Sequence, residues 1–254
     1  LRYLCSVGTC ILQRKDLTAK DIKMKNETSG KPMTRITATY VDHMGDDLSV
    51  VNAARVSFGK KSELQCTDIV LGVYEMTKRD RGLINYLASH KHISPFGHCF
   101  ASFHIKAPVF VARQLVKHKF LRWNEISRRY VDDVPEFYTP DVWRGRADDI
   151  KQGSGAECKS QYFPNIYADE INTKAVEDYK KMLQQGVAPE QARMILPQSA
   201  MTEWYWSGSL DAFADMCRLR CASDTQAETQ KVAWDISLKM EELFPVSWVA
   251  LRDE

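Results

Sequence analysis

The stretch RQLVKHKFLRWNEISRRY, residues 113–130, says most about the fold and chemistry of this chain. It follows an apolar run and contains six cations together with His118, Asn124, Glu125 and Ser127. Lys and Arg side chains can hold phosphates, and Ser, Glu and Gln side chains can hydrogen-bond the edge of a pyrimidine. Composition alone favours a simpler interpretation, a solvated basic face, because runs of charge usually lie on the surface.

On the N-terminal side of this stretch, the sequence predicts two strands and three helices. Residues 99–105 alternate apolar and polar side chains, as in a strand with one buried face. Residues 36–41 form a β-branched and aromatic run that suits a second strand. Pro108 is well placed in the first turn of a helix that runs to residue 116. The other two helices are expected over residues 49–55 and 68–89.

On the C-terminal side, a loop-rich stretch over residues 132–164 precedes a last third that reads as mostly helical. Gly186 suits the position after a helix, and Thr225 with Glu228 can form a capping box. The sequence predicts four helices here, over residues 173–185, 189–196, 210–221 and 225–244.

Strands early in the chain and helices late in it predict an α+β fold in a single domain. We expect this domain to cover residues 36–254, behind a mobile N-terminal extension of residues 1–35. The composition of residues 13–35 predicts this extension, because they are rich in Lys, Thr and Asn and show no apolar periodicity.

The composition of the 254-residue chain is that of an ordinary globular protein, with 44% hydrophobic and 27% charged residues. The formal net charge is only +2, so the chain as a whole carries no signature of polyanion binding. No run of 18 apolar residues is present, which argues against a membrane span, and the first twelve residues make a poor signal peptide.

The seven cysteines are odd in number and include no C-x-x-C pair. We therefore expect neither a metal site nor a disulfide framework, and a reducing, cytoplasmic location. Cys217 and Cys221 lie one helical turn apart in an apolar pattern, and we interpret them as small core residues.

Familiar nucleotide-binding and hydrolase motifs do not occur. There is no G-x-G-x-x-G, G-x-S-x-G or H-E-x-x-H pattern. Gly59-Lys60-Lys61-Ser62 is similar to the end of a phosphate loop, but Ala54 stands where that loop needs a glycine.

The order of residues after 116 resembles the signature of the flavin-dependent thymidylate synthases, R-H-R-x-x-S-x-N-x-x-S-x-R-Y. Lys117-His118-Lys119 stands for R-H-R, and the Asn, second Ser, Arg and Tyr of the signature are matched by Asn124, Ser127, Arg129 and Tyr130. Four further blocks resemble the family in the same order. They are 47–49 with 53–58 (DLS and AARVSF), 90–98 (HKHISPFGH), 192–197 (ARMILP) and Leu219-Arg220.

This resemblance covers roughly residues 36–250 and implies an antiparallel sheet flanked by long helices, with a helix-rich C-terminal third. It implies that dUMP is methylated at C5 to dTMP, with methylenetetrahydrofolate as the one-carbon donor and FAD, reduced by NADPH, as the reductant. It also implies a homotetramer whose active sites are shared between subunits. No nucleic-acid or membrane partner is implied.

The resemblance assigns site residues by position. Arg220 is the expected catalytic residue, because a cation beside the pyrimidine polarises the ring and favours its ionisation at N3. The expected dUMP-binding residues are Gln114, Lys117, Glu125, Ile126, Ser127, Arg128, Arg129, Arg193 and Arg220. The expected FAD-binding residues are Ser57, His92, Ser94, Lys117, His118, Lys119, Glu125, Ser209 and Asp215.

Several positions depart from the family pattern. Lys117 and Lys119 replace arginines, which keeps the charge and loses the bidentate donors, and Gly97 replaces a usual Glu. Arg122 occupies a usual Ser position. Near the expected flavin, Ser209, Asp211, Asp215 and Asp224 stand where many members carry Asn, Arg, Asn and His, so the flavin contacts must differ here.

Three alternatives stay open. An enzyme of the same fold can modify another pyrimidine nucleotide, such as dCMP, or add a hydroxymethyl group. The basic residues interleaved with Phe120, Trp123 and Tyr130 can instead form a single-stranded nucleic-acid-binding module. A flavin-binding relic without turnover is the third alternative.

Overall fold

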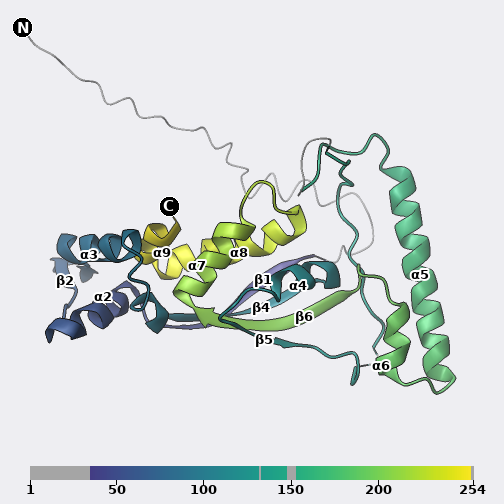
Figure 1. The fold of residues 1–254 in the computed structure, drawn as a ribbon, viewed down its shortest axis with the longest axis horizontal. Coiled ribbons are helices and arrows are strands. Elements are labelled where there is room, and N and C mark those ends of the chain that lie inside the picture. The colour runs from purple at the N-terminus through teal and green to yellow at the C-terminus, as the bar shows by residue number, and fades with distance from the viewer. Residues whose placement is uncertain (1–34, 132, 148–152, 253–254) are drawn as a thin grey trace, which may run out of the picture. The chain divides into compact units, whose positions relative to one another are not determined.

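The computed structural model describes residues 35–131, 133–147 and 153–252 (Figure 1). The expected mobile extension therefore lies, apart from Arg35, outside the described residues.

The centre of the fold is a four-stranded antiparallel sheet in the order β1-β4-β6-β5. Its strands are β1 (Thr37–Met44), β4 (Phe100–Pro108), β6 (Met201–Ser209) and β5 (Leu121–Glu125). The register sets Phe103 opposite Trp206 and Leu121 opposite Gly208. The predicted α+β fold with an antiparallel sheet is thereby confirmed.

One face of the sheet forms the core. Side chains of β4 and β6 alternate between buried and partly exposed, which directs Phe103, Trp204 and Trp206 inward. Phe213 of α7 (Leu210–Arg220) packs edge-on against Phe103 and Trp206, with ring centroids 5.4 and 5.7 Å apart. This aromatic cluster fixes α7 against the two central strands.

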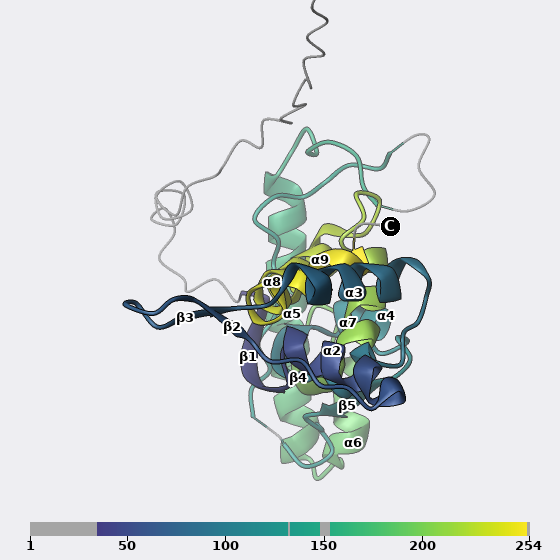
Figure 2. The same cartoon turned by 90° about the vertical axis from the view of Figure 1, so that its left-hand side faces the viewer.

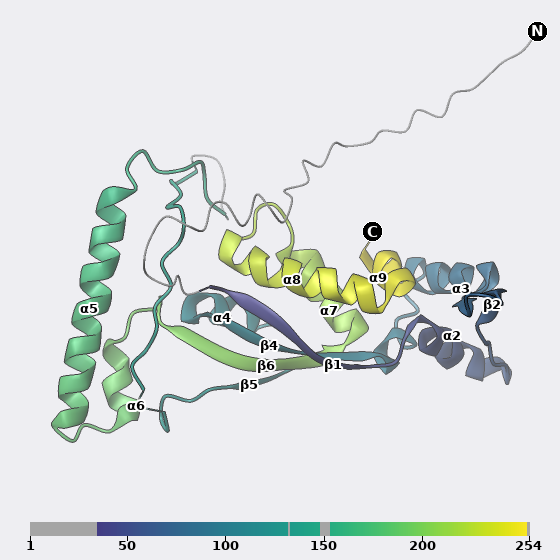
Figure 3. The ribbon, with the colours of Figure 1, turned by 180° about the vertical axis from the view of Figure 1, so that it is seen from behind.

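Helices α4 (Val109–Leu115), α7 and α8 (Ala227–Leu243) lie along this face, while α2 (Asp47–Arg55), α3 (Lys78–Ser89) and α9 (Pro245–Arg252) gather beyond one end of the strands (Figures 1 and 3). Asp47 is buried and accepts hydrogen bonds from the backbone N–H groups of Val246 and Ser247, both at 2.8 Å. The start of α9 is thereby capped by α2.

Helix α5 (Tyr162–Gln184) lies at the other end of the sheet, beside α6 (Pro189–Ala192) and the short 3₁₀ helix η3 (Arg193–Ile195) (Figures 1 and 3). Only Ala175 and Tyr179 of its 23 residues are buried. Gly186, with φ +82°, follows its last turn as expected. The predicted start at residue 173 is wrong: the helix begins eleven residues earlier, and Pro164 is tolerated in its first turn, where no N–H is needed.

The predicted helix over residues 68–89 is also wrong in its first half. Residues 65–75 form a hairpin of β2 (Gln65–Asp68) and β3 (Val73–Glu75), which projects to one side in Figure 2. Gly72, with φ +64°, supplies the turn conformation that L residues avoid. Helix α3 starts only where the Thr77 hydroxyl accepts from the N–H of Asp80.

Strands β5 and β6 were not expected from the sequence, and the predicted capping box at the start of α8 is wrong. The hydroxyl of Thr225 donates instead to the carbonyl of Leu219, and Glu228 pairs with Arg144. None of the described helices is long and apolar enough to cross a bilayer. Cys217 is buried as interpreted, whereas Cys221 is only half-buried, next to Arg252.

Candidate active site

The side chains of Arg220 and His118 meet at the end of α7. Arg220 is the last residue of α7, and His118 lies in the turn that follows α4. Arg220 Nε donates to His118 Nε2 at 3.0 Å, and Arg220 Nη2 donates to the backbone carbonyl of Gln114 at 3.3 Å. Helix α4, its following turn and α7 thus bring together three of the residues that the sequence assigns to the site.

Electrostatics fix the charge states of this pair. Burial and, to a smaller extent, the charge of Arg220 lower the pKa of His118 to about 4, against an opposing effect of Asp215. Burial also lowers the pKa of Arg220. A guanidinium stays protonated in proteins, so near neutral pH a neutral imidazole accepts a hydrogen bond from a half-buried cation.

The N-cap residue of α8, Gln226, and Thr229 in its first turn hold the side chain of Gln114. Gln114 Nε2 donates to Gln226 Oε1 at 2.6 Å, and the hydroxyl of Thr229, a fully buried residue, donates to Gln114 Oε1 at 3.0 Å. Sequence analysis did not assign Gln226 or Thr229 to the site. The only signal was that α8 is amphipathic, which places Thr229 toward the core but does not name its partner.

Strand β5 leads from this cluster to the polar segment at residues 125–130. Glu125 Oε1 accepts from the Thr202 hydroxyl at 2.6 Å, and its Oε2 accepts from Trp123 Nε1 at 3.1 Å. Ile126 donates its N–H to the carbonyl of Glu203 at 2.9 Å. These contacts fix where β5 ends on β6.

Beyond the strand, the chain turns on Ser127. Its hydroxyl accepts from the backbone N–H of Arg129 at 3.3 Å and from Arg129 Nε at 3.2 Å. Arg128 Nη1 donates to the carbonyl of Asp133 at 2.9 Å. Arg129 also lies 5.0 Å from the ring of the exposed Tyr130, so its guanidinium is held at the surface by local contacts.

Lys117 and Lys119 are exposed in the turn between α4 and β5, and neither ammonium has a partner within the described part of the chain. Phe120 follows with φ +64° and is 81% exposed. The turn lies close to β6 because Gly208 has no side chain: a Cβ there would stand 2.4 Å from Leu121 Cδ2 and 2.9 Å from the carbonyl oxygen of Phe120. Unpaired cations beside an exposed aromatic ring suit a phosphate-bearing aromatic ligand.

The remaining residues assigned from the sequence lie elsewhere on α7 or on other elements. His92 stacks on Tyr86 with ring centroids 6.1 Å apart, close after α3, and Ser94 follows it. Ser57 is exposed in the 3₁₀ helix η1 (Val56–Phe58). Ser209 is the N-cap residue of α7, and Asp215 pairs with Arg218 at 2.9 Å on the exposed face of α7.

Arg193 is not brought to Arg220 by the fold of one chain. It lies on η3, where its Nε donates to the carbonyl of Glu190 at 3.2 Å. Figures 1 and 3 show α6, which directly precedes η3, beyond the end of the sheet and away from α7. The roles of all these residues stay predictions.

The departures at positions 97 and 211 are neighbours in space. A Cβ on Gly97 would stand 4.0 Å from Asp211 Oδ1. This oxygen is buried and has no hydrogen-bond partner among the described residues. A buried, unpaired carboxylate oxygen is costly, so the position is suited to a donor group of a ligand.

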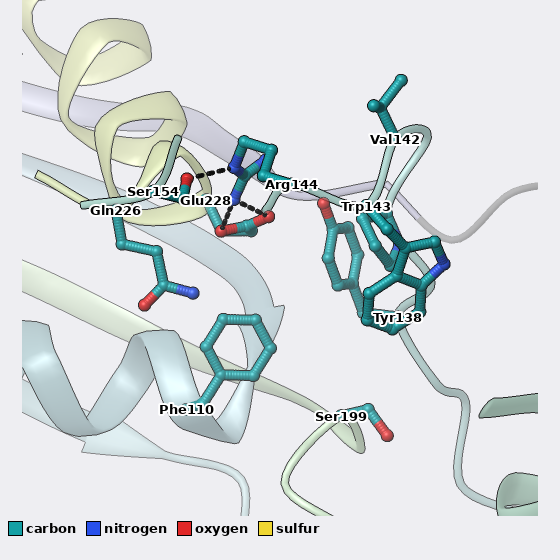
Figure 4. Close-up of a pocket in the computed structure, with 10 residues that line it drawn as sticks. Phe110, Tyr138, Val142, Trp143, Arg144, Ser154, Ser199, Gln226 and Glu228 are labelled. Atoms are coloured by element: carbon teal, nitrogen blue, oxygen red, sulfur yellow. Dashed lines mark hydrogen bonds and ion pairs between the residues drawn. The ribbon is translucent and has the colours of Figure 1, made fainter. Parts of the chain in front are cut away.

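A cavity of about 300 Å³ lies beside the start of α8 (Figure 4). Phe110, Tyr138 and Trp143 form its aromatic walls, and Gln226 lines it as well. Arg144 donates to both oxygens of the buried Glu228, at 2.7 and 2.8 Å, and to the Ser154 hydroxyl at 2.7 Å. Burial and the charge of Glu228 raise the pKa of Tyr138, so this phenol stays protonated.

Within the described ranges, no three His, Cys, Asp or Glu side chains gather in a way that could hold a metal ion. The fold and the site define a protein of the α+β class, built around an antiparallel sheet with a half-buried guanidinium at the end of α7.

Comparisons with known proteins place it more narrowly. Residues 39–246 match the family model described as "Thymidylate synthase complementing protein". The flavin-dependent thymidylate synthase of Thermus thermophilus is 37% identical over 214 residues, which are 84% of this chain and 74% of the relative. That of Thermosipho melanesiensis is 38% identical over 213 residues, covering 81% of this chain and 85% of the relative.

Among solved structures, the UMP/dUMP methylase PolB from Streptomyces cacaoi bound with 5-Br dUMP aligns with a TM-score of 0.72 and 30% identity. The alignment covers 87% of this chain and 96% of PolB. The chain belongs to the flavin-dependent thymidylate synthase family.

Proposed function

We propose that the protein methylates C5 of the uracil ring of dUMP and releases dTMP. The observation that carries this proposal is the clamped guanidinium of Arg220, in a chain whose relatives are named for this activity. A fixed, half-buried cation beside the pyrimidine favours its ionisation at N3 and stabilises the negative charge that makes C5 nucleophilic toward the one-carbon donor. Arg220 is therefore the proposed catalytic residue.

The nucleotide would be held by cations and by the polar turn after β5. Lys117, Arg129 and Arg193 suit the phosphate and carbonyl oxygens, while Gln114, Glu125 and Ser127 suit the polar edge of uracil. Ile126 and Arg128 contribute to the same turn, which local hydrogen bonds already order. Little ordering entropy is then lost when the substrate binds.

The residues around the turn fit a flavin dinucleotide. Lys117 and Lys119 are unpaired cations for its two phosphates, and Phe120 is an exposed aromatic surface for a ring. Asp211 has a buried, partnerless oxygen that suits hydroxyl donors of a ribityl or ribose group rather than phosphate. The proposed cofactor is FAD, with Ser57, His92, Ser94, His118, Glu125, Ser209 and Asp215 as the further contacts. When bound, FAD supplies the reducing equivalents for the methyl group.

Two co-substrates complete the proposed reaction. Methylenetetrahydrofolate is the one-carbon donor, and NADPH reduces the flavin. The chain's own contribution is binding and orientation, because none of its five described thiols is needed as a nucleophile on the pyrimidine.

We propose a homotetramer with shared active sites. The separation of Arg193 from Arg220 within one chain supports this assembly, because a second copy must bring its own η3 to the site if both residues contact one nucleotide. A cytoplasmic location is proposed as well, since the described cysteines are unpaired thiols.

The ribonucleotide UMP is a second candidate substrate. PolB, which shares 30% identity and the fold, is named a UMP/dUMP methylase and has been crystallised with 5-Br UMP as well. Discrimination between the two substrates depends on what contacts the ribose 2′ position.

The test is product analysis by mass spectrometry. The purified protein is incubated with FAD, NADPH and methylenetetrahydrofolate, and with dUMP, UMP or dCMP in separate tubes. A gain of one methyl group on dUMP is the expected result. If only UMP is methylated, or if dCMP is modified, the assigned substrate changes and the proposed cofactors stay the same. Bound flavin without any product in the three tubes contradicts the proposed activity.

A further inference from the structure

The only hydrogen-bonding side chain that Arg220 meets in the described part of the chain is His118. The bond joins Arg220 Nε to His118 Nε2 at 3.0 Å, and a second bond joins Arg220 Nη2 to the Gln114 carbonyl at 3.3 Å. No bond of Nη1 is found among the described residues. Two sides of the guanidinium are thus held by protein, and the side carrying Nη1 is left for a ligand.

The ring of His118 is itself fixed. It packs edge-on against Trp206, with ring centroids 6.4 Å apart, and Trp206 is only 1% exposed in the middle of β6. The imidazole can accept from Arg220 only if Nε2 carries no proton, which places the single ring proton on Nδ1. Burial and the neighbouring cation both favour this neutral form.

The third support is the anchor of Gln114. Gln226 and Thr229 hold the side chain of Gln114, and this fixes the position of its backbone carbonyl, which accepts from Arg220. Three elements therefore hold the guanidinium of Arg220 in place, directly or through a neighbour. They are the sheet through Trp206, α4 through Gln114, and α8 through its first turn.

We propose that His118 is a positioning residue for Arg220: its neutral imidazole, held against Trp206, orients the guanidinium so that Nη1 faces the pyrimidine. This goes beyond the flavin contact expected for His118. The expected kinetic effect rests on the proposed function, whereas the expected orientation of the His118–Arg220 pair does not.

The first test is kinetic and compares His118→Phe with His118→Gln. Phenylalanine keeps the ring against Trp206 but loses the acceptor, whereas the glutamine oxygen can reach the position of Nε2. We expect His118→Phe to lower kcat for dUMP at least about tenfold at saturating FAD, as for the loss of one charge-assisted hydrogen bond. His118→Gln should recover most of that loss.

A double-mutant cycle with Arg220→Ala separates positioning from a flavin role. If His118 acts through Arg220, His118→Phe changes little once Arg220 is absent. If the two losses multiply, or if excess FAD restores His118→Phe, the inference is overturned.

The second test needs no turnover. In a nitrogen-15 spectrum of the full-length protein, His118 should show a protonated Nδ1 and an unprotonated Nε2, and Arg220 Nε–H should be resolved and slow to exchange. In His118→Phe, which lacks these ring nitrogens, the Arg220 Nε–H signal should shift and exchange faster. A protonated Nε2 in the wild type overturns the inference even if the protein methylates dUMP. The expected spectrum together with no product in any tube contradicts the proposed function and leaves the positioning intact.

Discussion

At the scale of single residues, the strongest constraint on the site is the neutrality of His118. Its pKa is lowered to about 4 in the folded protein, against 6.5 for an ordinary histidine. Between these two values the unfolded chain binds more protons than the folded one, so the free energy of unfolding falls as the pH falls from 6.5 to 4.

We expect this histidine to contribute on the order of 1–2 kcal/mol of that loss, allowing for the solvent screening of a half-buried group. The measurement is urea unfolding of the wild type and of His118→Gln at several pH values between 4 and 7. The difference between the two proteins should shrink as the pH falls. A constant difference contradicts the lowered pKa.

A second residue-scale prediction concerns Gly208, which allows β5 to lie close to β6. A Cβ at this position would stand 2.4 Å from Leu121 Cδ2 and 2.9 Å from the Phe120 carbonyl oxygen. Gly208→Ala should therefore lower the free energy of unfolding by about 1–3 kcal/mol, because the turn must move. Thermal unfolding measures the change.

Gly82→Ala is the matched control for this substitution. Gly82 lies inside α3 with nothing within 4 Å of the added Cβ. The same chemical change should stabilise the protein by up to about 1 kcal/mol there, because alanine is the better helix former. Equal effects at both positions would falsify the steric argument.

At the scale of elements, α8 supports the candidate site through its contact with Gln114. Thr229→Val removes the hydroxyl that holds Gln114 and keeps the volume of the side chain. We expect KM for dUMP to rise about tenfold, with a loss of about 1 kcal/mol in stability, because Gln114 loses a buried donor. Steady-state kinetics and thermal unfolding check the two effects separately.

Thr173→Val on α5 is the control, since it makes the same change at an exposed helix position whose hydroxyl has no hydrogen-bond partner among the described residues. An unchanged KM in Thr229→Val, with or without a loss of stability, removes Gln114 from substrate binding.

The elements differ in how far the sequence predicts them. Strands β1 and β4 were found because their runs are β-branched or alternate cleanly. Strand β6 was missed, although its nine residues bury every second side chain and include Trp204, Tyr205 and Trp206. Strand β5 is an edge strand with only Leu121 buried, so its sequence looks like a polar turn.

The site, like the fold, could be predicted from the sequence only in part. Gln114, His118 and Arg220 come together in the fold, and His118 and Arg220 lie in blocks with a recognisable order, while the roles of all three stay predictions. Gln226 and Thr229 could not be predicted, because their role depends on how α8 packs on α4, more than 110 residues earlier in the chain. Helical periodicity predicts which side is buried, but it does not identify the partner.

At the scale of the whole molecule, α5 is the helix whose apolar side chains are largely left exposed within one chain. Phe163, Tyr167 and Ile171 lie on it and are each more than half exposed. An apolar surface on a helix with two buried residues is typical of a subunit interface. Asp169 and Glu170 lie in its first half and Lys180 and Lys181 near its end, so an antiparallel pair with a second copy can bring these two acidic residues opposite the two lysines.

We therefore expect Phe163→Asp combined with Tyr167→Asp to dissociate the proposed tetramer. Light scattering coupled to size-exclusion chromatography should report a smaller species with intact helical circular dichroism. Val70→Asp, at the exposed tip of the β2–β3 hairpin, is the comparison. If Val70→Asp dissociates the assembly and the α5 double variant does not, the hairpin and not α5 forms the interface. A monomeric wild type contradicts the proposed tetramer.

The strand order β1-β4-β6-β5 also matters while the chain is being made. Ser102 of β4 pairs with Ser207 of β6, whose codon is translated 105 residues later. At about 5–20 residues per second, the ribosome needs roughly 5–20 seconds to cover that interval. During this time β4 has β1 on one side and unpaired backbone N–H and C=O groups on the other, which exposes the nascent chain to mispairing and aggregation. Expression yield should therefore depend more on chaperone supply than the stability of the finished domain suggests.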